Sequence, residues 1–316
     1  MIYSFMGGRC GNQMFRYAFA RAHQRSNEPI ILDYRRVTTH REKGRQDYKN
    51  DLADFKLCES VKFLNQETPF EPDLTHTARF CRLYTDHCKR IGNDDEIDKL
   101  EKKMELVFRR LNVYEKLEYF EYPDYSGDRY LLGLAEDSRY FNGIRSVLLE
   151  ELTPKYPPLP KNERLYDLIC STDSVCLSFR KWNMYHKEFA FTFGICGRSY
   201  YRKAIDIMRQ LHPNCQFIVF ADDVSWAKEN YSFPVGTVFE DDGNPIWEKM
   251  RLMYSCRHFV IPNSTFAWWA QYLSRNPDRT VISPDRWSRS GTYQYSAIEP
   301  YFLTVCPDET DIADFQ

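Results

Sequence analysis

The segment VIPNSTFAWWAQYLS, residues 260–274, joins two apolar stretches through three small polar residues. The stretch before the junction, 258–261, predicts a short buried strand, and the stretch after it, 266–273, has apolar residues at helical spacing. A strand that leads directly into a helix is the repeating unit of α/β proteins. The segment therefore predicts an α/β fold and raises the question of what the polar junction does.

The polar junction, Asn263 to Thr265, is open to three interpretations. Asn, Ser and Thr are preferred helix N-cap residues, because their side-chain oxygens accept hydrogen bonds from first-turn amides. A helix N-terminus directly after a strand also suits a phosphate, since its amides and its dipole attract anions. The third interpretation is an N-glycosylation site, which requires export. Residues 1–10 lack the apolar stretch of a signal sequence, so we do not expect this modification.

The same alternation of strands and helices fills the second half of the chain. Apolar runs predict strands at 174–179, 216–221, 236–240, 258–262 and 280–283. Helical spacing predicts helices at 199–211, 225–231, 246–255 and 266–273. This order predicts a mostly parallel, doubly wound sheet, in which ligands bind at the carboxyl ends of the strands.

The first part of the chain shows the same kind of unit. In order, it predicts a strand at 2–6, a tight turn at 7–11, a helix at 12–26 and a strand at 29–34. A proline-rich segment, 154–164, interrupts regular structure. We therefore predict two Rossmann-like α/β domains, residues 1–160 and residues 161–316, with a tail at the C-terminal end. Between 35 and 125 the sequence is less informative, although charges at 94–110 predict an exposed helix.

Composition argues against several classes of function. The 316 residues have a formal net charge of −2 at pH 7, so neither a nucleic-acid partner nor a polybasic membrane patch is expected. No apolar stretch is long enough for an integral membrane segment, and we expect a cytoplasmic protein. The ten cysteines form no C-x-x-C pair, which argues against a zinc site and predicts reduced thiols. The oligomeric state is not indicated.

Polar side chains follow three of the predicted strands at their carboxyl ends. Arg180 follows the first strand of the second half, Asp222 and Asp223 follow the next, and Asn263–Thr265 follow a later one. Arginine binds phosphate with a bidentate fork, and a carboxylate accepts hydrogen bonds from a base or a ribose. The three strand ends together predict a nucleotide-type ligand. The simpler alternatives are a surface ion pair for Arg180 and a helix cap for the two aspartates.

The opening turn offers a rival site. Gly8 and Gly11 follow the first strand, and Asp33 ends the second, as in dinucleotide-binding proteins. The glycines lack the G-x-G-x-x-G spacing, however, so an NAD-dependent oxidoreductase is the weaker alternative. Asp33 is expected to be structural or to face the acceptor.

Three long segments resemble the α-1,2-fucosyltransferase family. GRCGNQMFRYAFARA, residues 8–22, is similar to the family's opening GRLGNQMFQYAFARA. FIVFADDVSWAKENY, 217–231, and IPNSTFAWWAQYLSRNPDRTVISPDRW, 261–287, resemble its later motifs, which include an NSSFSWWGAWL-type segment and a strand ending in P-x-x-W. EDSRYFNGIR, 136–145, is similar to a family segment ending in KYF.

The resemblance implies an inverting glycosyltransferase of GT-B architecture that uses GDP-L-fucose as donor substrate and needs no metal or other cofactor. The partners would be this nucleotide sugar, held by the C-terminal domain, and a glycan acceptor. Asn263, Ser264 and Thr265 would then face the donor diphosphate, and Trp268 and Trp269 would anchor their helix in the core. The alternatives left open are transfer of another GDP-linked sugar such as colitose, and nucleotide-sugar binding without turnover.

The resemblance also implies further donor-binding residues. In the opening turn these are Gly11, Asn12 and Gln13. After the strand at 174–179 the family has HIRRGDY where this chain has SFRKWNM.

Within this altered motif, Arg180 keeps the first arginine and Lys181 replaces the second. Ser178 stands in place of the histidine, Trp182 in place of the glycine and Asn183 in place of the acid. We expect Ser178, Arg180 and Lys181 to contact the donor, together with Asp222 and Asp223.

The base that activates the acceptor has two candidates. Glu188 lies at the offset where related α-1,6-fucosyltransferases have a functional glutamate, and His186 is the next choice. The expected catalytic residues are Arg180 and Glu188. Asn183 cannot take a proton in place of the acid that the family has.

Overall fold

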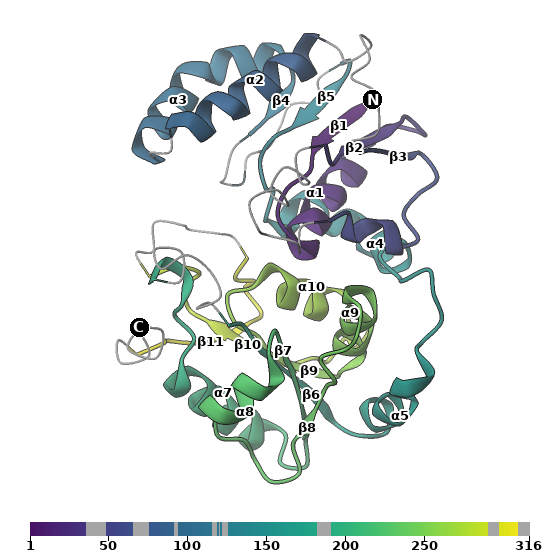
Figure 1. Ribbon diagram of the computed structural model, residues 1–316, viewed down its shortest axis with the longest axis vertical. Coiled ribbons are helices and arrows are strands. Elements are labelled where there is room, and N and C mark those ends of the chain that lie inside the picture. Colours follow the sequence, from purple (N-terminus) through teal and green to yellow (C-terminus); the bar gives the residue numbers. More distant parts are fainter. Residues whose placement is uncertain are drawn as a thin grey trace. The chain divides into compact units, whose positions relative to one another are not determined.

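Contacts within the protein divide the chain into two compact units (Figure 1). The computed structural model describes residues 1–35, 49–65, 76–91, 94–115, 119, 121, 126–181, 191–289 and 297–308. The first unit comprises Met1–Ala53 with Leu57–Val147, and the second comprises Asp54–Lys56 with Leu148–Gln316. No helix within these described ranges is long and apolar enough to cross a membrane.

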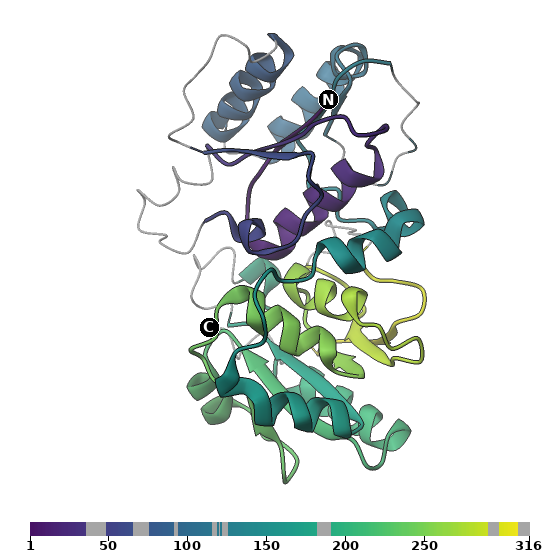
Figure 2. The same ribbon diagram turned by 90° about the vertical axis from the view of Figure 1, so that its right-hand side faces the viewer.

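The first unit is built on a five-stranded parallel sheet with the order β3-β2-β1-β5-β4. Its strands are β1 Ile2–Phe5, β2 Ile30–Asp33, β3 Val61–Leu64, β4 Val113–Tyr114 and β5 Arg129–Leu131. Its helices are α1 Cys10–Ala22, α2 His76–Ile91 and α3 Asp94–Arg110. Helix α1, drawn in purple, packs against β1 and β2 (Figure 1, Figure 2). The predicted β-α-β unit and the helix at 94–110 are confirmed.

The second unit is built on a six-stranded parallel sheet with the order β11-β10-β9-β6-β7-β8. Its strands are β6 Ser174–Phe179, β7 Gln216–Ala221, β8 Val238–Phe239, β9 His258–Val260, β10 Val281–Pro284 and β11 Leu303–Val305. Its helices are α5 Glu163–Ser171, α7 Arg198–Leu211, α8 Val224–Asn230, α9 Ile246–Ser255 and α10 Thr265–Leu273. Every element predicted here is present. This is the strand order of dinucleotide-binding folds. The strands before β9 are added on one side of β6, and those from β9 onward are added on its other side, so the order reverses between β6 and β9.

Short helices complete the backbone. Helix α4, Arg145–Glu151, spans the division between the units. One-turn 3-10 helices lie at Asp51–Asp54, Ser138–Tyr140, Asn142–Ile144 and Pro160–Asn162.

The proline-rich segment belongs to the second unit rather than to the division. Helix α9 holds the segment, because Glu248 Oε1 accepts hydrogen bonds from Leu159 N and from Asn162 Nδ2, both at 2.9 Å. Its other oxygen pairs with Arg251, which also bonds to the carbonyl of Tyr156. The division at 147/148 therefore lies before the boundary that prolines predicted at 160/161.

The tryptophan helix, α10, is buried along most of its length. Trp268 and Trp269 are fully buried, and Tyr272 stacks on Trp268 with ring centroids 4.9 Å apart. Helix α10 packs against α9. The prediction that both tryptophans anchor the helix in the core is confirmed.

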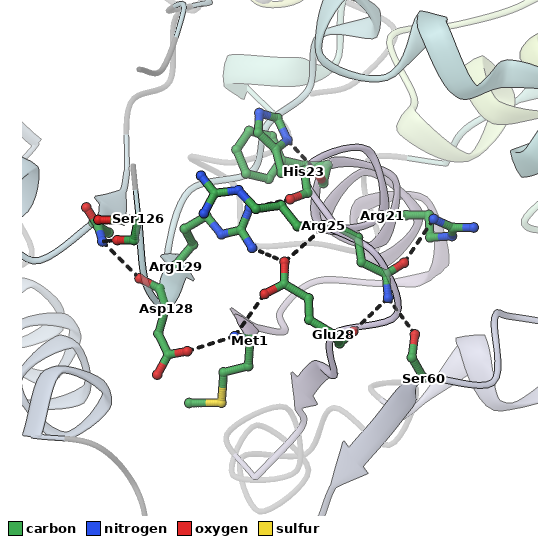
Figure 3. A network of polar contacts seen from close by, with 12 residues as sticks. Met1, Arg21, His23, Arg25, Glu28, Ser60, Ser126, Asp128 and Arg129 are labelled. Atoms are coloured by element: carbon green, nitrogen blue, oxygen red, sulfur yellow. Dashed lines mark hydrogen bonds and ion pairs between the residues drawn. The ribbon is translucent and has the colours of Figure 1, made fainter. Parts of the chain in front are cut away.

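A polar network fixes the amino ends of the first sheet (Figure 3). The amino group of Met1 lies 2.7 Å from Asp128 Oδ1 and 3.0 Å from Glu28 Oε2. Glu28 also pairs with Arg129, the first residue of β5. Because these groups bind one another between neighbouring strands, this edge of the sheet has a structural role.

The amino ends of the second sheet are held by two histidines. Asp173 lies 2.9 Å from His258 Nε2 and 3.2 Å from His212 Nδ1, and the two rings are 3.7 Å apart. This trio is the one metal-type cluster among the residues that the structure describes. Thr280 N donates to His258 Nδ1 at 3.0 Å, so the ring hydrogen is on Nε2 and donates to Asp173. The geometry therefore describes a hydrogen-bonded group and not a metal site.

The buried His258 predicts a loss of stability in mild acid. Burial lowers the pKa of His258, and His212 and Arg257 lower it further, while Asp173 opposes them. The unfolded chain takes up its proton first as the pH falls below about 6.5, so stability present above that pH is lost as the pH falls toward the folded pKa. We expect the melting temperature to fall from about pH 7 to about pH 5. The fall should be smaller in His258→Asn, whose amide oxygen still accepts from Thr280.

The matched control is His87→Asn, because His87 is exposed on α2. This variant should show the same dependence of melting temperature on pH as the wild type. Equal dependence in the wild type and in His258→Asn would contradict the assignment.

Candidate functional site

The three polar strand ends named by the sequence lie at one edge of the second sheet. Strand β6 lies between β7 and β9, and all three run parallel. Arg180 follows β6, Asp222 follows β7, and Ser264 follows β9 and begins α10. The edge lies at the point where the strand order reverses, which is where ligands bind in doubly wound sheets.

Two ion pairs join the ends of β6 and β7. Arg180 Nη1 lies 2.7 and 2.9 Å from the two oxygens of Asp222, and Lys181 Nζ lies 2.6 Å from Asp223. Asp223 also caps α8, where it accepts a hydrogen bond from Trp226 N at 2.8 Å. The hydrogen bond from Lys181 is the largest cause of the lowered pKa of Asp223, and the hydrogen bond from Trp226 N is the second. The simpler alternatives, an ion pair for Arg180 and a cap for Asp223, are thus both present in the structure.

These ion pairs leave the edge accessible. The side chains of Arg180 and Asp222 are 17% and 23% exposed. Asp222 and Asp223 therefore hold the two cations at this edge of the sheet.

Asn263 has an internal role. Its side chain is 2% exposed, and Nδ2 donates to the carbonyl oxygens of Phe193 at 2.8 Å and Trp287 at 2.7 Å. Oδ1 accepts from the thiol of Cys196. Asn263 thus joins the segment before α7 to the loop after β10, so it is not included in the donor site proposed below.

Ser264 is the N-cap residue of α10, but its side chain makes no capping hydrogen bond. Ser264 and Thr265 are half-buried, and the first turn of α10 contains no acidic residue. The capping interpretation is therefore wrong for the side chain of Ser264. The helix dipole and the Ser264 hydroxyl remain suited to an anion.

The rest of the altered motif is only partly described. Ser178 is a buried strand residue whose carbonyl oxygen accepts from the Tyr201 hydroxyl at 2.8 Å. Four other residues named by the sequence lie outside the described residues: Trp182, Asn183, His186 and Glu188.

The opening turn of the first unit is tightly built. Gly8 has a φ of +69°, and a Cβ there would lie 2.8 Å from Asn12 Cβ. Gly11 and Asn12 lie in the first turn of α1. Any side chain at Gly8 would therefore disturb both the turn and the start of the helix.

Gln13 is fully buried beneath this turn. Its Nε2 donates to the carbonyl oxygens of Gly8 at 3.0 Å and Lys49 at 2.9 Å. Its Oε1 accepts from the Tyr34 hydroxyl at 3.1 Å and from Asp51 N at 3.0 Å. All four hydrogen-bonding positions of the amide are occupied within the unit. We therefore leave Gln13 out of the donor site as well.

Asp33 is also structural. Arg35 contacts it at 2.8 Å through Nε and at 2.7 Å through Nη2, and the Tyr3 hydroxyl donates to it at 2.5 Å. Burial alone would raise the pKa of Asp33, but the hydrogen bonds from Arg35 and Tyr3 give a net lowering. A carboxylate held in this way does not bind a ribose, so the dinucleotide alternative loses its acidic residue.

The structure adds two arginines that the sequence analysis did not name. Arg286 and Arg289 follow β10, and Arg286 Nη2 donates to the carbonyl oxygen of Pro307 at 3.1 Å. The Arg289 guanidinium lies 3.8 Å from the ring centre of Phe191, and its backbone N donates to Thr192 O. Burial is the main cause of the lowered pKa of Arg289, and the positive charge of Arg286 lowers it further. Ligands bind at the carboxyl ends of parallel strands, so the predicted strand at 280–283 could have directed attention to these two arginines.

The fold and this edge define a class of protein: a two-unit α/β protein whose second unit has the strand order of a nucleotide-binding sheet, with Arg180 and Lys181 at its carboxyl edge. The sequence as a whole identifies the family. Residues 1–298 match the model of glycosyl transferase family 11, and the chain belongs to that family.

Individual relatives agree with this assignment. The chain is 25% identical over 309 residues to the O-antigen biosynthesis glycosyltransferase WbnK of Escherichia coli, covering 90% of this chain and 94% of the relative. It is 29% identical over 198 residues to an alpha-1,2-colitosyltransferase of Escherichia coli, covering 57% and 68%. It is 35% identical over 85 residues to human galactoside alpha-(1,2)-fucosyltransferase 1, covering 26% and 23%.

Solved structures agree with the fold. The chain resembles the NodZ alpha-1,6-fucosyltransferase soaked with GDP-fucose, with a TM-score of 0.51 at 13% identity. The match covers 90% of this chain and 94% of that one. The NodZ structure co-crystallized with GDP gives a TM-score of 0.50 at 14% identity. The chain therefore has the α/β fold with two parallel sheets.

Proposed function

We propose that the protein is an inverting glycosyltransferase that transfers L-fucose from GDP-fucose to a sugar hydroxyl of a glycan, in α-1,2 linkage to galactose. Membership in glycosyl transferase family 11 supports the reaction class. The observation that supports the donor site is the meeting of Arg180, Lys181 and the start of α10 at the switch point of the second sheet. We further propose a GT-B architecture, with the donor on the second unit and the acceptor on the first.

The proposed donor site stabilises the leaving group. Transfer breaks the bond between the sugar and the diphosphate, so negative charge develops on GDP. Arg180 and Lys181 supply positive charge, and Ser264 and Thr265 supply a hydroxyl and a helix N-terminus. Cations and dipoles fixed in place before the reaction are the usual means of stabilising such charge. Gly11 and Asn12 are proposed to contact the donor sugar or its phosphates from the first unit.

Two further features of the proposal concern cofactors and location. We propose that no metal is needed, since the cations named above neutralise the diphosphate. We place the protein in the cytoplasm. None of the ten cysteines, all within the described ranges, forms a disulfide, and reduced thiols are typical of a reducing compartment.

A second candidate donor has its own support. The Escherichia coli alpha-1,2-colitosyltransferase is 29% identical over 198 residues. GDP-colitose is therefore the alternative donor. Binding of a nucleotide sugar without turnover is the third possibility.

The test is product formation measured by mass spectrometry across a panel of GDP-sugars with galactose-terminated acceptors. We expect a mass increase of one deoxyhexose from GDP-fucose, and the same yield in excess EDTA. Transfer only from GDP-colitose would select the alternative donor. Activity lost in EDTA and restored by magnesium or manganese would contradict the metal-free proposal. Binding of GDP without transfer from any donor would contradict the proposed activity.

A further inference from the structure

Glu136 is an unusual carboxyl in the first unit. It lies in the loop after β5, near the carboxyl end of the strand, and is 6% exposed. Its oxygens accept no hydrogen bond from any residue that the structure describes, and Arg16, the charge that acts on it, lies beyond ion-pair distance. Burial raises the pKa of Glu136 to about 7.

The backbone around Glu136 is tightly turned. Ala135 has a φ of +51°, in the left-handed region that is unfavourable for a non-glycine residue. Asp137 N donates to Ala135 O at 2.9 Å, which places Glu136 at the tip of a three-residue turn. Strain of this kind is concentrated at functional sites.

Arg16 on α1 is the positively charged residue that acts on the pKa of Glu136. It is largely buried; Nη1 donates to the carbonyl oxygen of Phe5 at the end of β1, and Nε has no hydrogen-bond partner among the described residues. The Arg16 guanidinium lies against Gly7, where an added Cβ would be 3.4 Å from Nη1. Burial lowers the pKa of Arg16 to about 10. Since β5 pairs with β1, the arginine and the glutamate lie at the same edge of the sheet.

Other buried carboxylates show what a structural acid looks like in this protein. Asp33 is held by Arg35 and Tyr3, and Glu240 pairs with Lys249 at 3.0 Å and accepts from Asn244. A buried carboxyl without such bonds costs stability, and one that lies near the carboxyl ends of the strands is a candidate for a functional role.

We propose that Glu136 is the base that removes the proton from the acceptor hydroxyl, while Arg16 binds the same sugar. The inference rests on the proposed function. The acceptor proton moves to a carboxylate oxygen of Glu136 as the acceptor oxygen bonds to the anomeric carbon of the donor. The bond from that carbon to the diphosphate breaks, its electron pair leaves with GDP, and Glu136 then releases its proton to water.

The experiment compares Glu136→Gln with the wild type. The wild-type rate should rise with pH through a titration near the value for Glu136, since only the carboxylate accepts a proton. Glu136→Gln should lower kcat by about 10²–10³-fold and abolish that rise, while GDP still protects the protein from thermal unfolding.

Stability separates this role from a structural one. The pKa of Glu136 is higher in the folded than in the unfolded protein, so its ionisation destabilises the fold as the pH rises through that interval. Glu136→Gln should therefore melt at a higher temperature than the wild type at about pH 8 while being less active. A structural carboxylate would give a lower melting temperature.

The matched control is Glu115→Gln. Glu115 is another carboxyl of the first unit whose pKa burial raises, to about 8, but the groups that act on it are Glu101 on α3 and Tyr84 on α2. This variant should keep wild-type transfer and the wild-type pH profile. Wild-type kcat in Glu136→Gln, or loss of the pH-dependent rise in Glu188→Gln instead, would overturn the assignment to Glu136. Absence of transfer by the wild type itself would overturn the proposed function together with this inference.

Discussion

Arg180→Ala is expected to remove most of the thermal protection by GDP and to lower the transfer rate about 100-fold, the loss typical of removing one donor to a developing charge. A ligand at a hundredfold excess over its Kd stabilises the folded state by about 2.7 kcal/mol. That corresponds to a rise in melting temperature of about 5–10 °C for a unit of this size. Arg180 forms a partly exposed ion pair with Asp222, and such pairs contribute little to stability, so the ligand-free melting temperature should change little. Differential scanning fluorimetry with GDP, ADP, UDP and NAD measures the ligand-free melting temperature and the thermal protection by each ligand.

The control for Arg180 is Arg275→Ala. Arg275 pairs with Glu150 in an exposed ion pair of the same unit. Its loss should leave both the GDP shift and the transfer rate unchanged. Unfolding of Arg180→Ala without ligand, or protection by NAD but not by GDP, would contradict the proposed donor site.

The second large effect is a loss of stability in Asn263→Ala, which the neighbouring variant Ser264→Ala should not show. Asn263→Ala leaves the buried carbonyl groups of Phe193 and Trp287 without the donor that the structure shows. At about 1–3 kcal/mol for each lost partner, we expect the free energy of unfolding to fall by about 2–4 kcal/mol. Ser264→Ala should change it by less than about 0.5 kcal/mol, because the hydroxyl makes no capping bond. Ser264→Ala should instead reduce the GDP shift.

Chemical unfolding in urea measures these free energies. A stable Asn263→Ala variant that no longer binds GDP would show that Asn263 is a ligand and not a tie between loops. A Ser264→Ala variant as unstable as Asn263→Ala would show that the hydroxyl caps the helix after all.

Much of the second unit could be predicted from the sequence. Parallel strands buried on both faces appear as short continuous apolar runs, and β6 and β7 lie where those runs predicted them. In the first unit, β3 is only half-buried and β4 and β5 are very short, so their apolar signal is weak. Prolines at 154–164 predicted a boundary, but Glu248 and Asn162 attach this segment to α9. That bond joins residues far apart in the sequence, and no local pattern contains it.

The candidate site was predicted at the level of strand ends but not of individual side chains. Strand order placed Arg180, Asp222 and Ser264 at one edge. Whether an amide faces a ligand or the interior depends on partners elsewhere in the chain, such as Phe193 and Trp287 for Asn263. Glu136 begins the segment EDSRYFNGIR, but that resemblance does not single out its carboxyl, because the unusual state of Glu136 comes from its burial and from the lack of hydrogen bonds to the described residues.

The central claim is that the nucleotide binds at the carboxyl edge of the second sheet. Hydrogen–deuterium exchange with and without GDP tests it most directly. We predict slower exchange of backbone amides at 178–181, 221–226 and 262–268, with no change at the amino edge near His258. Protection confined to the opening turn, residues 6–13, and to the end of β2 would contradict the claim, because the nucleotide would then occupy the first sheet.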